Sequence, residues 1–287
     1  MRISRAIADL LRERIVPTFL RAGKAAEHYA GVMREIGEGA KTAARTAGNA
    51  DLMGAGQVLA SKAAPVSGFN PVHGFGNSTR TRLSAIYGDR LRISGVGPAA
   101  EQHLRDLELL PDSFHNKLLG YFASHPEGGI DIIDGTVTDI LTDLRGVTPR
   151  GWPPGSTWDD VPGLHDPSTH RVIIGVGPHG NVSLAVHETG HAFDDAIGNA
   201  SESVEFRQLY DKMDITKPYY AQPGNAGRQE TFAESLAVWA LNRHMPPDYR
   251  ANSFADKFGI RTNKQARGAL LDSYFSNLQH RLEPHPL

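Results

Sequence analysis

The chain has 287 residues, enough for one large domain or two smaller ones with a sizeable core. Its 30 lysine and arginine residues stand against 32 aspartate and glutamate residues, a formal net charge of -2 that gives no reason to expect a nucleic-acid partner. The absence of cysteine excludes disulfides and thiolate metal ligands, and no apolar run approaches the length of a membrane span.

The first 64 residues are predicted to form a helical segment. Apolar residues between Ile3 and Leu20 recur at helical spacing, with arginines between them and an interruption near Pro17. This amphipathic helix fits docking on the body of the protein, and the alternative is contact with a membrane surface, export machinery or a chaperone. It lacks the uninterrupted apolar block and the small-residue cleavage site of a standard secretory signal, so export would need another route.

The next stretch, residues 65–98, is expected to be a linker-like region. Glycine, proline, serine and asparagine are frequent in it, which favours turns and loops, with room for a short helix around Leu83 to Tyr87. A second domain is expected over residues 99–287.

Helical and extended patterns both occur in this second domain and predict an α+β fold. Apolar spacing indicates helices over residues 104–110 and 114–122. Short apolar runs indicate strands at residues 130–133 and 171–176. We therefore expect a small mixed sheet with helices packed beside it.

A loop-rich stretch is expected between the two predicted strands, from Val147 to His170, because glycine and proline are frequent there. His165, His170 and His179 are expected to be solvated, with one of them able to reach a cleft. Each is an isolated histidine in a polar segment, and such residues are more often surface side chains than ligands.

Residues 187–191 read His-Glu-Thr-Gly-His, and these residue types at this spacing point to a metal site. On a helix, positions i and i+4 share a face, so His187 and His191 can present two imidazole nitrogens to one ion. Glu188 can then take a proton from a water molecule on that ion, whose pKa zinc lowers to about 7. The chemistry indicated is hydrolysis, most often of a peptide bond.

The surroundings of this motif predict a buried helix. Asn181 is the expected N-cap, apolar residues flank the histidines, and Gly198 reads as a helix stop. The HExxH pattern arises by chance in roughly one such chain in forty. The alternative of two structural histidines and a solvated glutamate therefore stays open until a further ligand is found.

A catalytic zinc needs a third protein ligand. The extended HExxHxxGxxH pattern is excluded because Asp194 and Ile197 occupy the positions of its glycine and last histidine. The helix predicted over residues 229–241 is apolar nearly all round, so Glu230 and Glu234, one turn apart, are costly to bury without a cation. We favour Glu230 as the ligand and Glu234 as the residue that orients a ligand. The alternative is that both glutamates pair with arginines or are exposed.

These two segments carry a resemblance to a known family. The run His187-Glu-Thr-Gly-His191-Ala-Phe-Asp-Asp195, a following tyrosine and Glu230-Thr-Phe-Ala-Glu234 are similar to the catalytic domain of anthrax lethal factor and its relatives among bacterial toxins and effectors. The resemblance extends from about Val172 to Leu241 and more weakly from about Leu107. It implies a gluzincin fold, a zincin-type catalytic domain with two active-site helices.

The resemblance also implies roles for single residues. Glu230 would bind zinc, in agreement with the choice made from the residues alone. A tyrosine ahead of it would help to stabilise the oxyanion; Tyr219 and Tyr220 are the candidates, and we prefer Tyr220. The link from the tyrosines to Glu230 is slightly longer than the family pattern. Asp194 is expected to lie behind the ligands, either orienting His191 or capping the helix end.

The function predicted from these observations is that of a zinc-dependent endopeptidase acting on protein or peptide substrates. The resemblance further implies a secreted bacterial toxin or effector, delivered to a target cell by a non-standard route. Two alternatives from other classes are a zinc amidase or peptidase acting on cell-wall peptides, and a catalytically silent binding module that keeps the fold. The strand before the motif fits a protease whose sheet edge binds extended substrate.

Overall fold

The structure, a computed structural model, describes residues 76–148 and 155–283, so the helical segment predicted for residues 1–64 lies outside the described residues. The chain divides into two compact units. The smaller comprises residues 1–71, 141–160 and 178–180; its described part holds two short 3₁₀ helices, Thr142–Leu144 and Trp158–Asp160. The larger unit comprises residues 72–140, 161–177 and 181–287 and contains the predicted site.

Within the described residues, four short strands form one mixed sheet with the spatial order β1-β2-β4-β3. The parallel strands are β1 (Leu91–Ile93), β2 (Gly129–Ile132) and β4 (Arg171–Ile174), and β3 (Gly163–Asp166) pairs antiparallel with β4 at the edge. The strands predicted at residues 130–133 and 171–176 are confirmed as β2 and β4. The strand that leads into the motif helix is thus an interior strand, and β3, which we expected to be loop, is the edge strand.

Helices make up most of the larger unit, and the fold class is α+β, as expected. They are α5 (Gly76–Tyr87), α6 (Pro98–Glu108), α7 (Asp112–Ala123), α8 (Leu184–Ala196), α9 (Val204–Asp211), α10 (Ala226–Asn242), α11 (Pro247–Phe258) and α12 (Lys264–Leu282), with the 3₁₀ helices η2 (Gly88–Arg90), η3 (Val137–Asp139), η6 (Ala200–Glu202) and η7 (Pro218–Ala221) between them. Of the helices in the described part of the chain, none combines the length and apolarity needed to cross a membrane.

The expectation of a linker over residues 65–98 is wrong for its second half. Helix α5 buries Leu83 and Tyr87 in the core, and β1 pairs with β2 in register Leu91 to Ile130. Most of the glycine and proline residues of this stretch lie before residue 77 or after residue 94, so the sequence between them is free to form regular structure. Residues 65–75 lie outside the described part.

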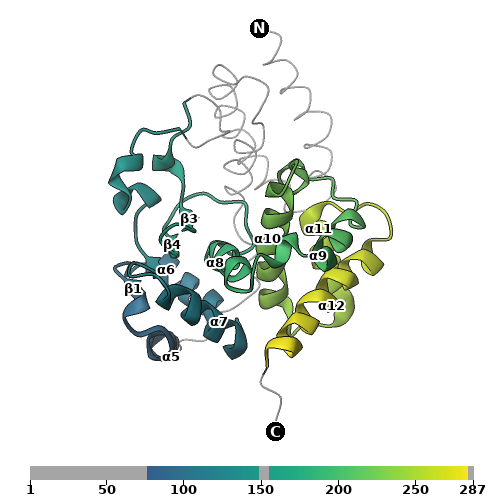
Figure 1. The fold of residues 1–287 in the computed structure, drawn as a ribbon, viewed down its shortest axis with the longest axis horizontal. Helices are drawn as coiled ribbons and strands as arrows, with labels where there is room; N and C mark the ends of the chain where they lie inside the picture. Colours follow the sequence, from purple (N-terminus) through teal and green to yellow (C-terminus); the bar gives the residue numbers. More distant parts are fainter. Residues whose placement is uncertain (1–75, 149–154, 284–287) are drawn as a thin grey trace, which may run out of the picture. The chain divides into compact units, whose positions relative to one another are not determined.

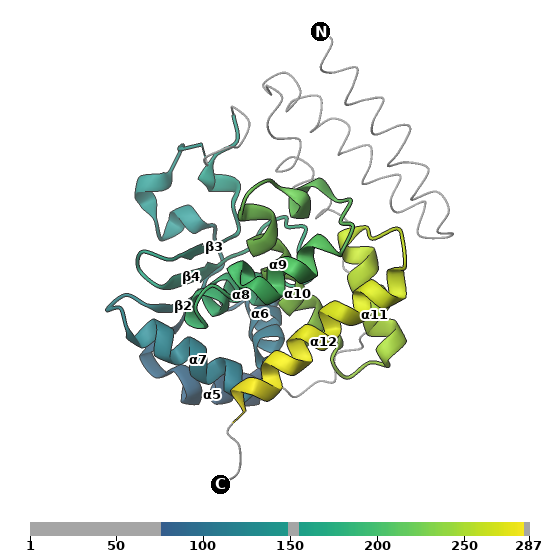
Figure 2. The same cartoon turned by 45° about the vertical axis from the view of Figure 1, so that its right-hand side comes forward.

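The core lies between one face of the sheet and the helices. The side chains of Ile130, Ile132, Val172 and Ile174 alternate with residues of the opposite face and pack with α6, α7 and α8. Helix α8 lies between the sheet and α10, and α11 and α12 cover the far side of α10 (Figures 1 and 2). This layering holds the two motif helices side by side in the middle of the unit.

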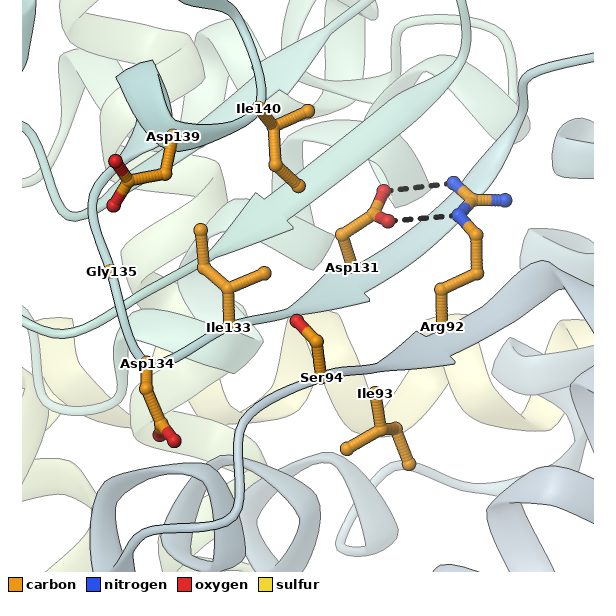
Figure 3. A pocket seen from close by; sticks show the side chains of 9 residues that line it. All are labelled: Arg92, Ile93, Ser94, Asp131, Ile133, Asp134, Gly135, Asp139 and Ile140. Atoms are coloured by element: carbon orange, nitrogen blue, oxygen red, sulfur yellow. Dashed lines mark hydrogen bonds and ion pairs between the residues drawn. The ribbon is translucent and has the colours of Figure 1, made fainter.

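The opposite face of the sheet carries an ion cluster centred on the buried carboxylate of Asp131. Its carboxylate accepts hydrogen bonds from Arg92 Nε and Nη2 at 2.8 Å each and from Arg171 Nε at 2.7 Å. Figure 3 shows the Arg92–Asp131 pair in the wall of a pocket of about 550 Å³. Burial alone would raise the pKa of Asp131, but the hydrogen bonds from Arg92 and Arg171 outweigh it and lower that pKa.

We expect Asp131→Asn to lower the free energy of unfolding by about 1–3 kcal/mol at pH 7, because two guanidinium groups lose a charged acceptor. A carboxylate with a depressed pKa in the folded state stabilises the protein above its unfolded-state pKa, and this contribution is lost as the pH falls through the folded-state value. Urea unfolding of both proteins at pH 7 and at about pH 3 measures the effect. A difference between the two proteins that stays constant with pH would contradict the ion-pair origin.

Candidate metal centre

Helix α8 begins at Leu184 after a capping serine rather than at the expected asparagine. The hydroxyl of Ser183 accepts a hydrogen bond from Val186 N at 3.3 Å, which satisfies one free amide of the first turn. The helix ends at Ala196, and Gly198 follows with a φ of 84°, as the stop signal predicted. The first turn of α8 is buried, which anchors the motif that comes next.

Three side chains from α8 and α10 converge at the crossing of these helices. Glu230 Oε2 lies 3.2 Å from His187 Nε2 and 3.7 Å from His191 Nε2, and the two imidazole nitrogens are 3.3 Å apart. One ligand atom from each residue lies within 4.8 Å of the others. His187 is buried, whereas His191 and Glu230 are partly exposed, so one side of the group is open.

The donor set fits a cation. The other ring nitrogen of His187, Nδ1, lies 2.8 Å from Glu234 Oε2, so Nδ1 carries a proton that it donates to this carboxylate, and Nε2 is the nitrogen that faces Glu230. Glu230 Oε2 is itself buried and has no hydrogen-bond partner within the described residues. Acceptors facing one another at this distance repel unless a positive charge lies between them.

The electrostatics of the site point in the same direction. Burial disfavours the charged form of His187, but the two neighbouring carboxylates, Glu230 and Glu234, more than offset burial and raise its pKa to about 10. Burial would raise the pKa of Glu230, yet the two histidines hold it well below its ordinary value. A proton can join two of these acceptors, whereas a divalent metal ion can be shared by all three, and two imidazoles with one carboxylate are ligands that zinc accepts.

A glycine allows α8 and α10 to approach closely. A Cβ atom on Gly190 would lie 2.9 Å from Ala233 Cα and 3.1 Å from Ala233 O, both backbone atoms that cannot yield without moving α10. Gly190 lies between His187 and His191, and Ala233 lies between Glu230 and Glu234. The small residues at this crossing therefore determine the distance between the histidines and Glu230.

We expect Gly190→Ala to destabilise the protein by about 1–3 kcal/mol and to weaken metal binding, because the two helices must separate. Gly120→Ala is the matched control, since Gly120 also lies within a helix and a Cβ there meets nothing within 4 Å. Thermal unfolding and a zinc titration of both variants measure the two effects. Equal zinc affinity in both variants would show that the crossing distance does not set the site.

Glu188 is partly exposed beside the histidine pair. Burial raises its pKa, with a further rise from Glu230 and Glu234 that the two histidines oppose. A carboxylate whose pKa moves toward neutrality is a better general base at physiological pH. The edge strand passes close to it, because a Cβ on Gly163 would lie 2.8 Å from Glu188 Cγ and 2.8 Å from Leu184 Cδ1.

Glu234 lies fully buried behind His187. Its Oε2 accepts from His187 Nδ1 at 2.8 Å, and its Oε1 accepts from Val182 N at 2.8 Å and pairs with Lys257 Nζ at 2.5 Å. The carboxylate therefore fixes which nitrogen of His187 faces Glu230. Lys257, more than twenty residues further along the chain, was not anticipated, since no local pattern marks a long-range partner.

The structure corrects the preference for Tyr220 over Tyr219. Tyr219 forms a side-chain hydrogen bond with Glu230; burial, Glu230 and Glu188 raise its pKa well above the ordinary value. Tyr220 is buried instead, and its ring packs edge-on against Phe258 with centroids 4.9 Å apart. Both residues belong to η7, where consecutive side chains point about a third of a turn apart, so only one of them can face the site.

Asp194 takes the second of the two roles expected for it, at the end of α8. Its carboxylate accepts hydrogen bonds from Ser201 N at 2.7 Å and Ser201 Oγ at 2.5 Å, which fastens the end of α8 to η6 and engages both carboxylate oxygens away from His191. This aspartate thus closes a turn and does not orient a ligand. The reason is geometric, because the chain reverses at Gly198 and brings Ser201 over the end of the helix.

Two of the three histidines expected to be solvated are part of an internal network. The hydroxyl of Tyr121 lies 3.1 Å from His165 Nε2 and 3.2 Å from Asp195 Oδ2, and the Tyr121 ring stacks on His170. The side chain of His165 is only 6% exposed, and burial with the nearby His191 lowers its pKa to about 3. Tyr121, His165 and Asp195 thereby connect α7, β3 and α8. His179 belongs to the smaller unit.

Comparison with known proteins agrees with this geometry. Residues 101–248, just over half of the chain, match the family model described as anthrax toxin lethal factor, N- and C-terminal domain. The chain therefore belongs to the anthrax lethal factor family, as the motifs led us to expect. Helices α8 and α10, which carry His187, His191 and Glu230, both lie within the matched residues.

Two curated relatives are more specific in name. A Pro-Pro endopeptidase of Clostridioides difficile is 38% identical over 122 residues, and one of Paenibacillus alvei is 35% identical over 122 residues. These matches cover 40% and 38% of this chain, and the chain spans about half the length (54%) of both relatives. The solved structure of the Paenibacillus alvei Pro-Pro endopeptidase matches with a TM-score of 0.48 and 26% identity, over 65% of this chain and 99% of that one.

Proposed function

We propose that this chain is a zinc-dependent endopeptidase that hydrolyses peptide bonds in protein substrates. The observation that carries the proposal is the convergence of His187 Nε2, His191 Nε2 and Glu230 Oε2 into one group of acceptors with an open side. Family membership and two relatives named Pro-Pro endopeptidases support it. Bound by these three residues, zinc would supply Lewis-acid activation of a water molecule and of the scissile carbonyl.

The remaining roles follow from what lies around the three ligands. Glu188, next to His187 on the open side, is suited to take the proton of the attacking water and to pass it to the leaving amine. The hydroxyl of Tyr219 is suited to donate a hydrogen bond to the oxyanion as its negative charge develops. Glu234 keeps His187 oriented throughout.

The edge strand β3 is the proposed support for the substrate. Its Gly163 packs against Glu188, so an extended peptide added along β3 would pass the proposed base. A Cβ atom at this position would force the side chains of Glu188 and Leu184 to shift. The family name further suggests, as part of the proposal, that the protein is secreted as a toxin or effector and acts on proteins of another cell.

Cleavage of defined peptides tests this function. The first candidates contain Pro-Pro bonds, because both curated relatives are named for such bonds, and casein and purified peptidoglycan complete the panel. We expect cleavage of a peptide or protein that stops on removal of zinc with 1,10-phenanthroline and returns on its addition. Cleavage that persists after chelation would contradict the zinc mechanism, and cleavage confined to peptidoglycan would favour the cell-wall alternative.

Tyr219→Phe is expected to lower kcat by about 10²-fold with little change in KM, because one hydrogen bond to the oxyanion is lost while the ring remains. Tyr220→Phe is the matched control, since its packing on Phe258 uses the ring alone. Steady-state kinetics of both variants on one cleaved peptide measure the difference. A larger loss in Tyr220→Phe than in Tyr219→Phe would restore the preference made from the sequence.

A further inference from the structure

Lys257 reaches the back of the proposed metal centre from a third helix. It lies in the last turn of α11, and its Nζ lies 2.5 Å from Oε1 of Glu234, the residue whose other oxygen holds His187. The side chains of this pair are 11% and 0% exposed. Removing one partner of an ion pair this deeply buried strongly destabilises a protein, because the other charge is left buried without a counter-charge.

The end of α11 is held in place, so Lys257 has a fixed position. Gly259 ends the helix with a φ of 68°, and Phe258 O accepts a hydrogen bond from Thr216 N at 3.2 Å, just before η7. Phe258 packs on the ring of Tyr220, and Lys257 Nζ lies 5.7 Å from the centroid of the same ring. Tyr220 therefore forms the surface on which the lysine rests.

Formal charges show what the lysine contributes. Glu188, Glu230 and Glu234 place three negative charges around the two histidines, and a divalent ion with neutral histidines leaves one of them unbalanced. Lys257 places a positive charge directly against Glu234, and the charge of Lys217 also acts on this carboxylate. An unbalanced charge on a fully buried carboxylate is strongly unfavourable, whereas a balanced group can keep its hydrogen bonds.

We propose that Lys257 is a positioning residue for the metal centre: it neutralises Glu234, so that Glu234 stays fixed against His187 Nδ1 and His187 Nε2 stays aimed at the ion. This inference rests on the proposed zinc site. Lys257 acts through Glu234 and touches neither substrate nor metal. The pair lies on the opposite side of His187 from Glu230, so it sets ligand orientation without occupying the open side.

A double-mutant cycle on zinc affinity tests the proposal. Lys257→Met, Glu234→Gln and the double variant are titrated with zinc in competition with a chelator at fixed pH, and the Co²⁺-loaded proteins are compared by visible absorption. We expect each single change to weaken zinc binding by about 10- to 100-fold. We expect the double variant to bind zinc at least as tightly as the single variant with the lower zinc affinity. A neutral amide beside methionine leaves no unbalanced charge. Lys257→Arg should keep most of the affinity.

Two controls separate the possible failures. Lys264, 53% exposed and 3.7 Å from Asp256, is the matched lysine, and Lys264→Met should leave zinc affinity unchanged. Unchanged affinity in Lys257→Met, or losses that simply add in the double variant, would overturn the proposal while the zinc site stands. Wild-type protein that binds no zinc would overturn the proposed function itself. If Lys257→Met does not fold, folding of the double variant supports the proposal, and failure of the double variant as well contradicts it.

Discussion

Glu188→Gln is expected to lower kcat by about 10²–10⁴-fold, the range that a positioned general base contributes. Glutamine keeps the shape of the side chain beside His187 but cannot take a proton. Glu188 is not one of the three residues proposed to bind zinc. Zinc stoichiometry and unfolding temperature are therefore expected to stay close to those of the wild type. The substitution should therefore lower kcat without removing zinc from the protein.

The measurement is peptide cleavage with the zinc content of each preparation determined on the same sample. Glu205→Gln is the control, because Glu205 is exposed and pairs with Arg281 on the surface at 3.2 Å. Wild-type turnover in a fully zinc-loaded Glu188→Gln protein would refute the role of Glu188 as base. Loss of zinc together with activity would instead place Glu188 among the ligands.

Glu230→Gln is expected to weaken zinc binding by more than about 100-fold, which exceeds the effect of changing a residue behind a ligand. The amide keeps a hydrogen-bond acceptor for Tyr219 but removes the negative charge that faces both histidines. Chelator competition at one pH measures the affinity. Zinc affinity within tenfold of the wild type would mean that another acid completes the site.

The motif helices were predictable because their signals are local. The spacing of His187 and His191 along one helix, and the apolar surroundings of Glu230 and Glu234, are properties of short segments. The pattern of apolar residues in each segment indicates which face of the helix is buried. The residues that meet at the crossing of α8 and α10 can therefore be predicted from the sequence. The strands β2 and β4 were found for the same reason, as short apolar runs between turns.

The edge strand β3 was missed because its sequence, Gly163-Leu-His-Asp166, has neither an apolar run nor a clear alternation. It is a strand because β4 lies beside it and pairs with it, a tertiary effect that outweighs local preference. The same holds for His165, whose burial comes from packing with Tyr121 and not from its own neighbours in the sequence.

The choice between Tyr219 and Tyr220 could not be made from the sequence for a different reason. A single step along η7 turns a side chain from the site into the core, and the direction is fixed by Phe258, which packs on Tyr220 from a distant helix. The partnership of Lys257 and Glu234 is equally non-local. This pairing depends on how α10 and α11 pack against each other, and no residue spacing within either helix predicts it.

The proposed chemistry depends on one divalent ion bound jointly by α8 and α10. A crystal structure of the zinc-loaded protein, with anomalous scattering recorded on both sides of the zinc absorption edge, tests this most directly. We predict one strong zinc peak between Nε2 of His187, Nε2 of His191 and the carboxylate of Glu230. A zinc peak bound by other residues, or none at this crossing in protein shown to contain zinc, would contradict the account.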